Sequence, residues 1–162
     1  MTDITYIPTK QGWLYLAVML DLYSRMVVGW SMSGNCDEKL VERALGQALA
    51  RRRPKPGLLH HSDRGSQYTS YAYQACLKKH EIHSSMSRKG NCWDNSVMES
   101  FFGTLKGECV REMVYASHDE ARLALFIYIE TYYNRVRRHS TLGYVSPLQY
   151  EKMEKYYALQ NV

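Results

Sequence analysis

Trp13-Leu14-Tyr15-Leu16-Ala17-Val18-Met19-Leu20-Asp21 is a nearly continuous apolar run of strand length. A strand that is apolar at almost every position is typical of a sheet covered on both faces. Residues 3–8 before it and residues 26–31 after it are also strand-like, and short turns join them to it. The three segments therefore predict an antiparallel meander with the apolar run at its centre.

Beyond the meander, helical and strand-like patterns alternate along the chain. The predicted segments are a helix at 38–50, a strand at 58–62, a helix at 70–79, a strand at 81–85, a helix from 96, a helix at 118–138 and a helix at 147–156. Asp37 is the expected N-cap of the first helix, and Ser117 with Glu120 fits a capping box. This order predicts an α/β fold with a five-stranded mixed sheet and helices on both faces.

Length and charge narrow the class of protein. The chain has 162 residues, enough for one domain, and a formal net charge of +5. Basic clusters at residues 51–55 and 135–139 favour a polyanionic partner such as nucleic acid, although a merely soluble basic surface carries the same signal. The sequence shows no apolar run of membrane-spanning length and no secretory signal pattern, so we expect a cytoplasmic protein.

The turn Gly90-Asn91 introduces the helix that carries most of the chemical interest. Either Asp94 or Ser96 is expected to cap it, and Ser96 with Glu99 fits a capping box. An apolar stripe at helical spacing defines its buried face, formed by Met98, Phe102, Leu105 and Cys109.

Glu99 and Lys106 lie seven residues apart on that helix. At about 100° per residue they return to the same face with an offset of roughly 20°. A carboxylate and an ammonium group on one exposed face are most often simply solvated. The pair gains a chemical meaning only if other parts of the chain bring partners to it.

Two further carboxylates supply those partners. Asp3 begins the first predicted strand and Asp63 ends the fourth, so their side chains meet if the two strands are neighbours. Glu99 would then be the third carboxylate. Like charges at one point need a cation, and oxygen ligands suit Mg²⁺ or Mn²⁺. Two such ions can support an in-line phosphoryl displacement.

Several motifs in a fixed order carry a family resemblance. They are Asp3–Tyr6 (Asp-Ile-Thr-Tyr), Gly12–Ala17 (Gly-Trp-Leu-Tyr-Leu-Ala), Asp21–Arg25 (Asp-Leu-Tyr-Ser-Arg), His61–Tyr68 (His-Ser-Asp-Arg-Gly-Ser-Gln-Tyr), Asp94–Lys106 and Tyr133–Tyr144. From residue 3 to about residue 150, the chain resembles the integrase catalytic core of bacterial insertion-sequence transposases, whose cores are similar to retroviral integrases. The resemblance implies a ribonuclease H-like fold and a function in DNA transposition, integration and recombination.

The same resemblance implies roles for single residues. Asp3, Asp63 and Glu99 match a DDE catalytic triad that binds two Mg²⁺ (or Mn²⁺) ions, and Lys106 matches a residue that contacts the transposon end. The implied chemistry has two steps. Water first cleaves a phosphodiester at the transposon end, and the freed 3′-hydroxyl then attacks target DNA. A homo-oligomer assembled on DNA is the implied active form.

Other residues keep two interpretations each. Asn95 either supports the metal site and touches DNA or caps its helix. Arg64 is expected to position DNA, whereas Gln67 and Tyr68, which follow it, either do the same or shape the loop.

The C-terminal motif is equally open. Asn134, Arg137 and His139 either bind DNA phosphates or pin the last helix to the core. Asp21 is expected to close a turn with Ser24 or Arg25. The tryptophans Trp13 and Trp30 are expected in the core.

Transposases of this kind also carry an upstream helix-turn-helix module, which is often separately encoded. Nothing in residues 1–162 matches it, so we expect an integrase core with a C-terminal helical extension from about residue 117. The chain begins two residues before Asp3, which favours a core fragment or a truncated copy. The alternative to an active enzyme is a catalytically idle remnant that folds and binds DNA or an intact transposase.

Overall fold

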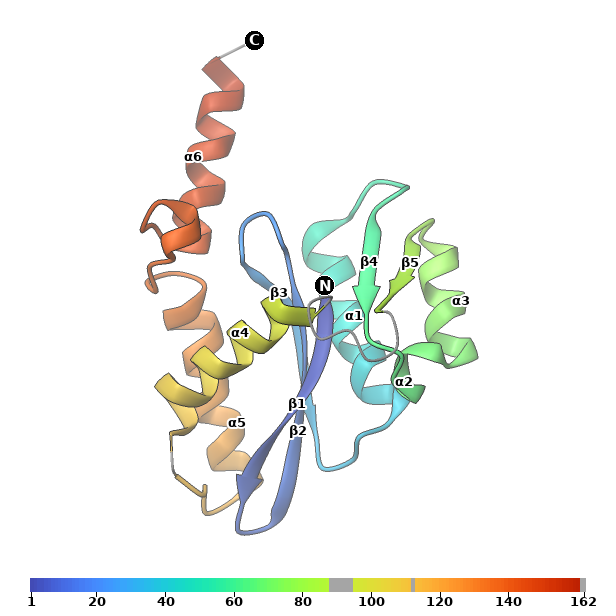
Figure 1. Cartoon of the computed structure of the whole chain (residues 1–162), viewed down its shortest axis with the longest axis vertical. Coiled ribbons are helices and arrows are strands. Elements are labelled where there is room, and N and C mark those ends of the chain that lie inside the picture. Colours follow the sequence, from blue (N-terminus) through green and yellow to red (C-terminus); the bar gives the residue numbers. More distant parts are fainter. Residues whose placement is uncertain (88–94, 112, 161–162) are drawn as a thin grey trace.

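The computed structural model describes residues 1–87, 95–111 and 113–160. The strands are β1 (Thr2–Thr9), β2 (Gly12–Leu20), β3 (Val27–Ser33), β4 (Leu59–Ser62) and β5 (His83–Met86). The α-helices are α1 (Glu38–Arg52), α2 (Ser66–Thr69), α3 (Tyr71–Lys79), α4 (Ser96–Leu105), α5 (His118–Ile127) and α6 (Pro147–Gln160), as labelled in Figure 1. The π-helical segments η2 (Lys106–Val110) and η3 (Tyr128–Tyr133) continue α4 and α5, and the 3-10 turn η4 (Ser140–Leu142) precedes α6.

β2 is the central strand of a three-stranded sheet and pairs antiparallel with β1 and β3. Its side chains alternate between two buried clusters. Leu14, Leu16 and Val18 belong to one cluster, and Ala17 and Met19 belong to the other. Both faces of the strand are therefore covered, which explains the continuous apolar run and confirms the predicted meander.

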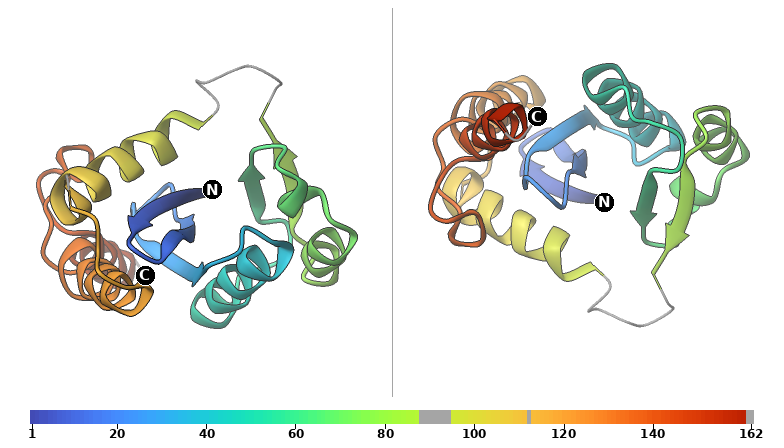
Figure 2. Two further views of the ribbon diagram at one scale, coloured as in Figure 1. Left: turned by 90° about the horizontal axis from the view of Figure 1, so that it is seen from below. Right: turned by 90° about the horizontal axis from the view of Figure 1, so that it is seen from above.

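Helices cover both faces of this sheet, as predicted. The helices α4 and α5 lie on one side of β1–β3, and α1 lies on the other (Figure 2). A glycine in β3 allows α1 to approach closely. A Cβ atom at Gly29 would lie 2.3 Å from the carbonyl oxygen of Ala44 and 2.8 Å from the Cβ of Ala48. The missing side chain therefore sets the distance between strand and helix.

β4 and β5 pair in parallel as a separate two-stranded sheet. β4 lies beside β1, but the described residues contain no hydrogen-bonded ladder between them, so the predicted single five-stranded sheet is wrong in this respect. Polar groups near the start of β1 have other partners. The Ile4 amide donates to Oδ1 of Asp3 at 2.7 Å, and the Thr2 hydroxyl lies 3.3 Å from the Tyr68 hydroxyl. These groups at the start of β1 therefore contact side chains and not the backbone of β4.

The helix starts predicted at Asp37 and Ser117 are confirmed. Each side chain accepts a hydrogen bond from an amide in the first turn of its helix, and Ser70 does the same for α3. Residues 66–69, expected to form a loop, are the short helix α2.

The long helix predicted at residues 118–138 is shorter than expected. It passes into η3, which ends at Tyr133. Asn134 accepts from the Val27 amide at 2.9 Å and donates to the Val27 carbonyl at 3.0 Å, which ties this segment to the start of β3. Asn134 therefore pins the C-terminal part of the chain to the core.

The C-terminal helix α6 extends away from the sheets (Figure 1). No helix in the described part of the chain combines the length and apolarity needed to cross a membrane.

Candidate active site

Asp3 lies near the start of β1, at the side of the sheet next to β4, and its side chain is half-buried. Its Oδ1 accepts a hydrogen bond from the Ile4 amide, and its Oδ2 accepts one from Nδ2 of Asn95, both at 2.7 Å. Burial raises the pKa of Asp3 above its ordinary value, against the lowering effect of these two hydrogen bonds. The carboxylates of Asp63 and Glu99 raise it further. The charges of the other two predicted triad members therefore reach Asp3.

Asp63 directly follows β4, and its position is set by the loop behind it. Its Oδ1 accepts the Gly65 amide at 2.9 Å. A Cβ atom at Gly65 would lie 3.0 Å from that same Oδ1 and 3.0 Å from Oε1 of Gln67. The glycine thus allows the backbone to close tightly around the carboxylate.

The residues that follow Asp63 mostly shape the loop. Nε2 of Gln67 donates to the Cys36 carbonyl at 3.0 Å, and Tyr68 is buried with its hydroxyl near Thr2. Arg64 is exposed, and its Nε donates to the Ser87 carbonyl at 2.9 Å. Of the two interpretations for Gln67 and Tyr68, these contacts favour the structural one.

α4 begins without the expected capping box. Ser96 is its first residue, and Asn95 occupies the N-cap position without making a capping bond. Asp94, the other expected cap, lies outside the described residues. Asn95 instead gives its amide to Asp3, which lies 92 residues away in the sequence. This contact supports the interpretation that Asn95 belongs to the site.

Glu99 lies in the first turn of α4 and is exposed. The predicted apolar stripe lies beneath it, with Met98, Phe102 and Leu105 all buried. Glu99 makes no hydrogen bond or ion pair with the residues that the structure describes. A carboxylate in the first turn also interacts favourably with the positive end of the helix dipole.

The three carboxylates are not assembled into a ready metal site. Among residues 1–87, 95–111 and 113–160, no group of three His, Cys, Asp or Glu side chains is placed to hold an ion. The donor set nevertheless fits Mg²⁺ or Mn²⁺, because all its atoms are oxygens. Oδ1 of Asn95 adds a buried oxygen beside Asp3 that has no hydrogen-bond partner among the described residues. A bound ion would require the carboxylates to move closer together.

Lys106 lies where α4 passes into η2, with its Nζ 4.7 Å from the centre of the Tyr6 ring. Tyr6 in turn packs edge-on against Trp13, and both rings are about half exposed. The expectation that Trp13 lies in the core is therefore wrong. Trp30 does pack against the core, and its Nε1 donates to Glu130 at 2.8 Å.

The predicted turn role of Asp21 is confirmed, because its Oδ1 accepts the amides of Tyr23 and Ser24. At the C-terminal motif, Glu108 joins the two π-helical segments. Its Oε1 and Oε2 accept hydrogen bonds from Nε of Arg137 at 2.9 and 3.0 Å, and Oε2 also accepts one from the Tyr128 hydroxyl at 2.8 Å. Arg137 is therefore held in place from its Nε side.

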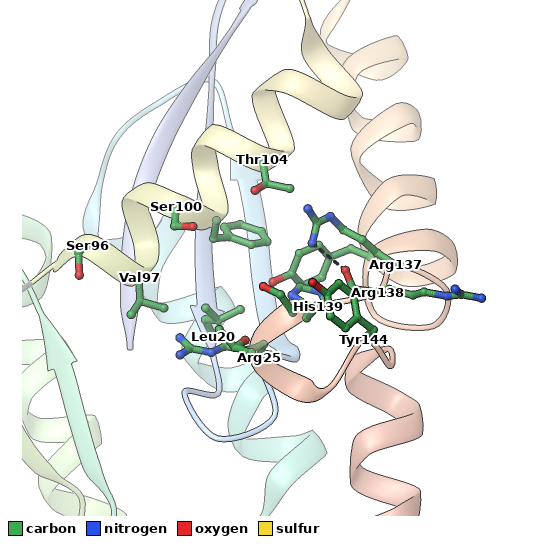
Figure 3. A pocket seen from close by; sticks show the side chains of 14 residues that line it. Leu20, Arg25, Ser96, Val97, Ser100, Thr104, Arg137, Arg138, His139 and Tyr144 are labelled. Carbon is green, nitrogen blue, oxygen red and sulfur yellow. Dashed lines mark hydrogen bonds between the residues drawn. The ribbon is translucent and has the colours of Figure 1, made fainter.

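A pocket of about 530 Å³ lies between α4 and residues 137–144 (Figure 3). Arg137 and His139 line it, together with residues that sequence reasoning missed. These are Arg25, Ser96, Ser100, Thr104 and Tyr144. The hydroxyl side chains of α4 recur every four residues, a spacing that places them on one helix face and that the sequence alone displays.

Two sequence models of the family described as "Integrase core domain" match the chain, over residues 1–92 and residues 80–147. The first match covers more than half of the 162 residues. The chain belongs to the integrase core domain family.

Integrase core relatives with about half of their residues identical include named transposases. The transposase for insertion sequence element IS904 from Lactococcus lactis subsp. lactis (strain IL1403) is 53% identical over 150 residues, which cover 93% of this chain and 59% of that protein. Transposase InsF for IS3A from Escherichia coli (strain K12) is 51% identical over 149 residues, which cover 92% of this chain and 52% of that protein. The chain thus spans little more than half the length of these curated relatives.

Solved viral integrase structures share the fold at low sequence identity. The simian T-cell lymphotropic virus intasome in complex with PP2A regulatory subunit B56 gamma matches with a TM-score of 0.74 and 20% identity, covering 91% of this chain and 51% of that chain. The HTLV-2 integrase catalytic core domain in complex with magnesium, in a trimeric form, matches with a TM-score of 0.67 and 18% identity, covering 91% of each chain. These integrase core matches confirm the predicted ribonuclease H-like fold.

Proposed function

We propose that this integrase core domain is the catalytic core of an insertion-sequence transposase, a polynucleotidyl transferase that cleaves and joins DNA strands. The observation that carries the proposal is the setting of Asp3. Its half-buried carboxylate is oriented by Asn95, and the charges of Asp63 and Glu99 act on its pKa. The named transposase relatives support the same reaction class.

Asp3, Asp63 and Glu99 would hold the Mg²⁺ or Mn²⁺ ions, which supply the positive charge needed to activate a nucleophile and stabilise the leaving oxygen. The chain's own residues would contribute orientation. Asn95 fixes one oxygen of Asp3, and the Gly65 amide fixes one oxygen of Asp63. Glu99, exposed and unpaired among the described residues, is the member most able to move toward the others.

The substrate would be DNA, which accounts for the net charge of +5. Arg64 and Lys106 flank the carboxylates on the loop after β4 and at the end of α4, and we assign them phosphate contacts. Two transposon ends must be joined in one event, so we also propose a homo-oligomer on DNA. Recognition of the end sequence would come from a helix-turn-helix module outside residues 1–162.

A paired substitution tests the catalytic assignment. Glu99 and Glu38 are both exposed and both lie in the first turn of a helix, α4 and α1 respectively. On a labelled transposon-end duplex with Mg²⁺ or Mn²⁺, Glu99→Gln is expected to lower nicking and strand transfer at least about 1000-fold, roughly 4 kcal/mol of barrier. Glu38→Gln should retain the activity of the unmodified chain.

Metal binding provides a second readout that does not depend on catalysis. Mn²⁺ should raise the unfolding temperature of the unmodified chain and of Glu38→Gln, and raise that of Glu99→Gln much less. Equal activity in the two variants would refute the role of Glu99. No activity and no Mn²⁺ response in the unmodified chain would instead support the idle remnant.

A further inference from the structure

The pocket between α4 and residues 137–144 is lined by cationic side chains, and no acidic residue is among its described lining. Arg25 lies at the end near Val97, and Arg137 lies at the end near Thr104 (Figure 3). Glu108 holds only the Nε side of Arg137. The pocket thus places the guanidinium groups of Arg25 and Arg137 around a space of about 530 Å³, a size typical of small-ligand sites, and Arg138 is a third arginine of its lining.

Arg25 is the more unusual of the two arginines. It follows the turn after β2, is half-buried, and has a left-handed backbone with φ of 59°. Such a conformation is uncommon for a residue other than glycine and costs free energy. Within the described part of the chain, no carboxylate pairs with Arg25. A half-buried, unpaired cation in a strained position indicates a site that awaits an anion.

The pKa of His139 also reflects the positive charges of the two arginines. Burial lowers the pKa of His139 to about 4, and the charges of Arg137 and Arg25 contribute to the shift, against a raising effect of Glu108. The ring is therefore neutral at physiological pH. Its Nε2 is buried and has no hydrogen-bond partner among the described residues. His139 is therefore a neutral residue in the lining that leaves the arginine charges of the pocket uncompensated.

α4 forms the opposite wall. Ser96, Ser100 and Thr104 lie at intervals of four residues on the face toward the pocket (Figure 3). Hydroxyl groups of this kind donate hydrogen bonds to phosphate oxygens. Ser100 directly follows Glu99 in α4, and Glu99 itself is not among the described lining of the pocket.

An exposed aromatic ring completes the pocket. Tyr144 is 70% exposed, has a left-handed φ of 62°, and lies beside His139 (Figure 3). The rings of Phe101 and Tyr133 lie beneath it in the lining. An exposed aromatic side chain next to arginine and hydroxyl groups is the combination that binds single-stranded nucleic acid, because every base can stack on it.

We propose that this pocket binds one unpaired nucleotide of the DNA strand that passes Glu99. Its phosphate would lie between Arg25, Arg137 and the hydroxyl groups of α4, and its base would stack on Tyr144. A base that is paired inside a duplex cannot enter the recess, so the site selects DNA with a frayed or single-stranded end. The inference rests on the proposed function, because it places the nucleotide next to the strand to be cut.

Binding is measured without a divalent ion, so that the result is independent of catalysis. The probe is a duplex with a short single-stranded tail that contains 2-aminopurine, and a blunt duplex of the same length serves as its reference. Arg25→Gln is compared with Arg122→Gln. Arg122 is also half-buried, but it lies on α5, pairs with Asp119 and is not among the lining of this pocket. Tyr144→Ala is compared with Tyr71→Ala, on the exposed surface of α3.

We expect Arg25→Gln and Tyr144→Ala each to weaken binding of the tailed duplex about tenfold, and to weaken binding of the blunt duplex less than about twofold. Tyr144→Phe should retain tight binding. Loss of one phosphate contact should also reduce the salt dependence, by about 0.7 in the slope of log K against log salt concentration. The control variants should bind like the unmodified chain.

Equal affinity for tailed and blunt duplexes would overturn the proposal, and so would equal effects of Arg25→Gln and Arg122→Gln. Circular dichroism and thermal unfolding identify any variant that fails to fold, and Tyr144→Phe then decides the outcome. Glu99→Gln separates the two proposals. If it loses strand transfer but binds the tailed duplex normally, both stand. If the unmodified chain binds the tail selectively but never cleaves DNA, only the proposed function fails.

Discussion

The helices α1 and α4 pack on opposite faces of the same sheet, yet they are built differently. α1 is capped by Asp37 and closes on β3 through Gly29, so its polar and apolar groups find partners locally. α4 begins at Asn95, which makes no cap and gives its amide to Asp3. The start of α1 is built for stability, because its N-cap side chain bonds to its own helix. At the start of α4, the side chain in the N-cap position bonds to Asp3 instead.

Buried polar atoms without a partner among the described residues occur on both sides of the sheet. Nε of Arg52 is one on α1, and Asn95 Oδ1 and His139 Nε2 are two on the side that carries α4. Buried polar atoms of this kind destabilise a fold unless a ligand or water satisfies them. A missing partner alone therefore does not distinguish the two sides, and the contrast rests on the contact between Asn95 and Asp3.

The largest expected effect tests the α1 side. Gly29→Ala should destabilise the fold by about 3 kcal/mol, because the new Cβ would overlap the backbone of α1. Gly46→Ala, within α1 but with no atom within 4 Å of the added Cβ, should instead stabilise by about 0.5–1 kcal/mol. Urea unfolding of both variants gives the comparison. A neutral Gly29→Ala would mean that α1 does not sit tightly on β3.

Removing the side chain at the start of each helix sharpens the contrast between α1 and α4. Asn95→Ala should lower strand transfer about 100-fold, roughly 2.7 kcal/mol of barrier, because Asp3 loses the contact that orients it, while stability changes little. Asp37→Ala should cost about 1 kcal/mol of stability with unchanged activity. Strand transfer and urea unfolding are measured on both. Similar stability losses in the two variants would make Asn95 a structural cap after all.

A further expected effect is a pH dependence of stability. His60 on β4 is buried with Nε2 2.9 Å from the Tyr73 hydroxyl, and burial lowers its pKa to about 3. The unfolded chain binds a proton near pH 6.5 but the folded chain does not, so stability falls as the pH drops from about 6.5 toward 3. The loss is up to about 1.4 kcal/mol per pH unit. His60→Gln should reduce this slope in urea unfolding between pH 6.5 and 5, and an unchanged slope would contradict it.

Much of the fold could be predicted because its signals are local. The N-caps Asp37 and Ser117 bond to amides three residues later, and the alternation along residues 13–21 follows from one strand between two covered faces. Such signals lie within a few residues of their effect. The choice between the two interpretations of Asn95 has the opposite property. Asn95 donates to a residue 92 positions away instead of capping its own helix, and no local sequence pattern predicts this contact.

The candidate site divides in the same way. The positions of Asp3, Asp63 and Glu99 at the ends of elements could be predicted, since strand and helix boundaries are locally encoded. Their separation could not, because it depends on how β4 approaches β1 without a backbone ladder. The pocket was missed for the same reason, since Arg25 and Tyr144 lie far apart in the sequence and meet only when Asn134 ties the C-terminal segment to β3.

The sequence by itself determined most of the order of strands and helices and the two-sided sheet, because side-chain periodicity and capping act over a few residues. Only the tertiary structure decided which polar groups remain without partners. Polar groups compete for the hydrogen-bond partners that the fold brings within reach. Here Asn95 donates to Asp3, and Arg25 lines a pocket. Those outcomes, rather than the motifs alone, carry the DNA contacts that we propose for this integrase core domain.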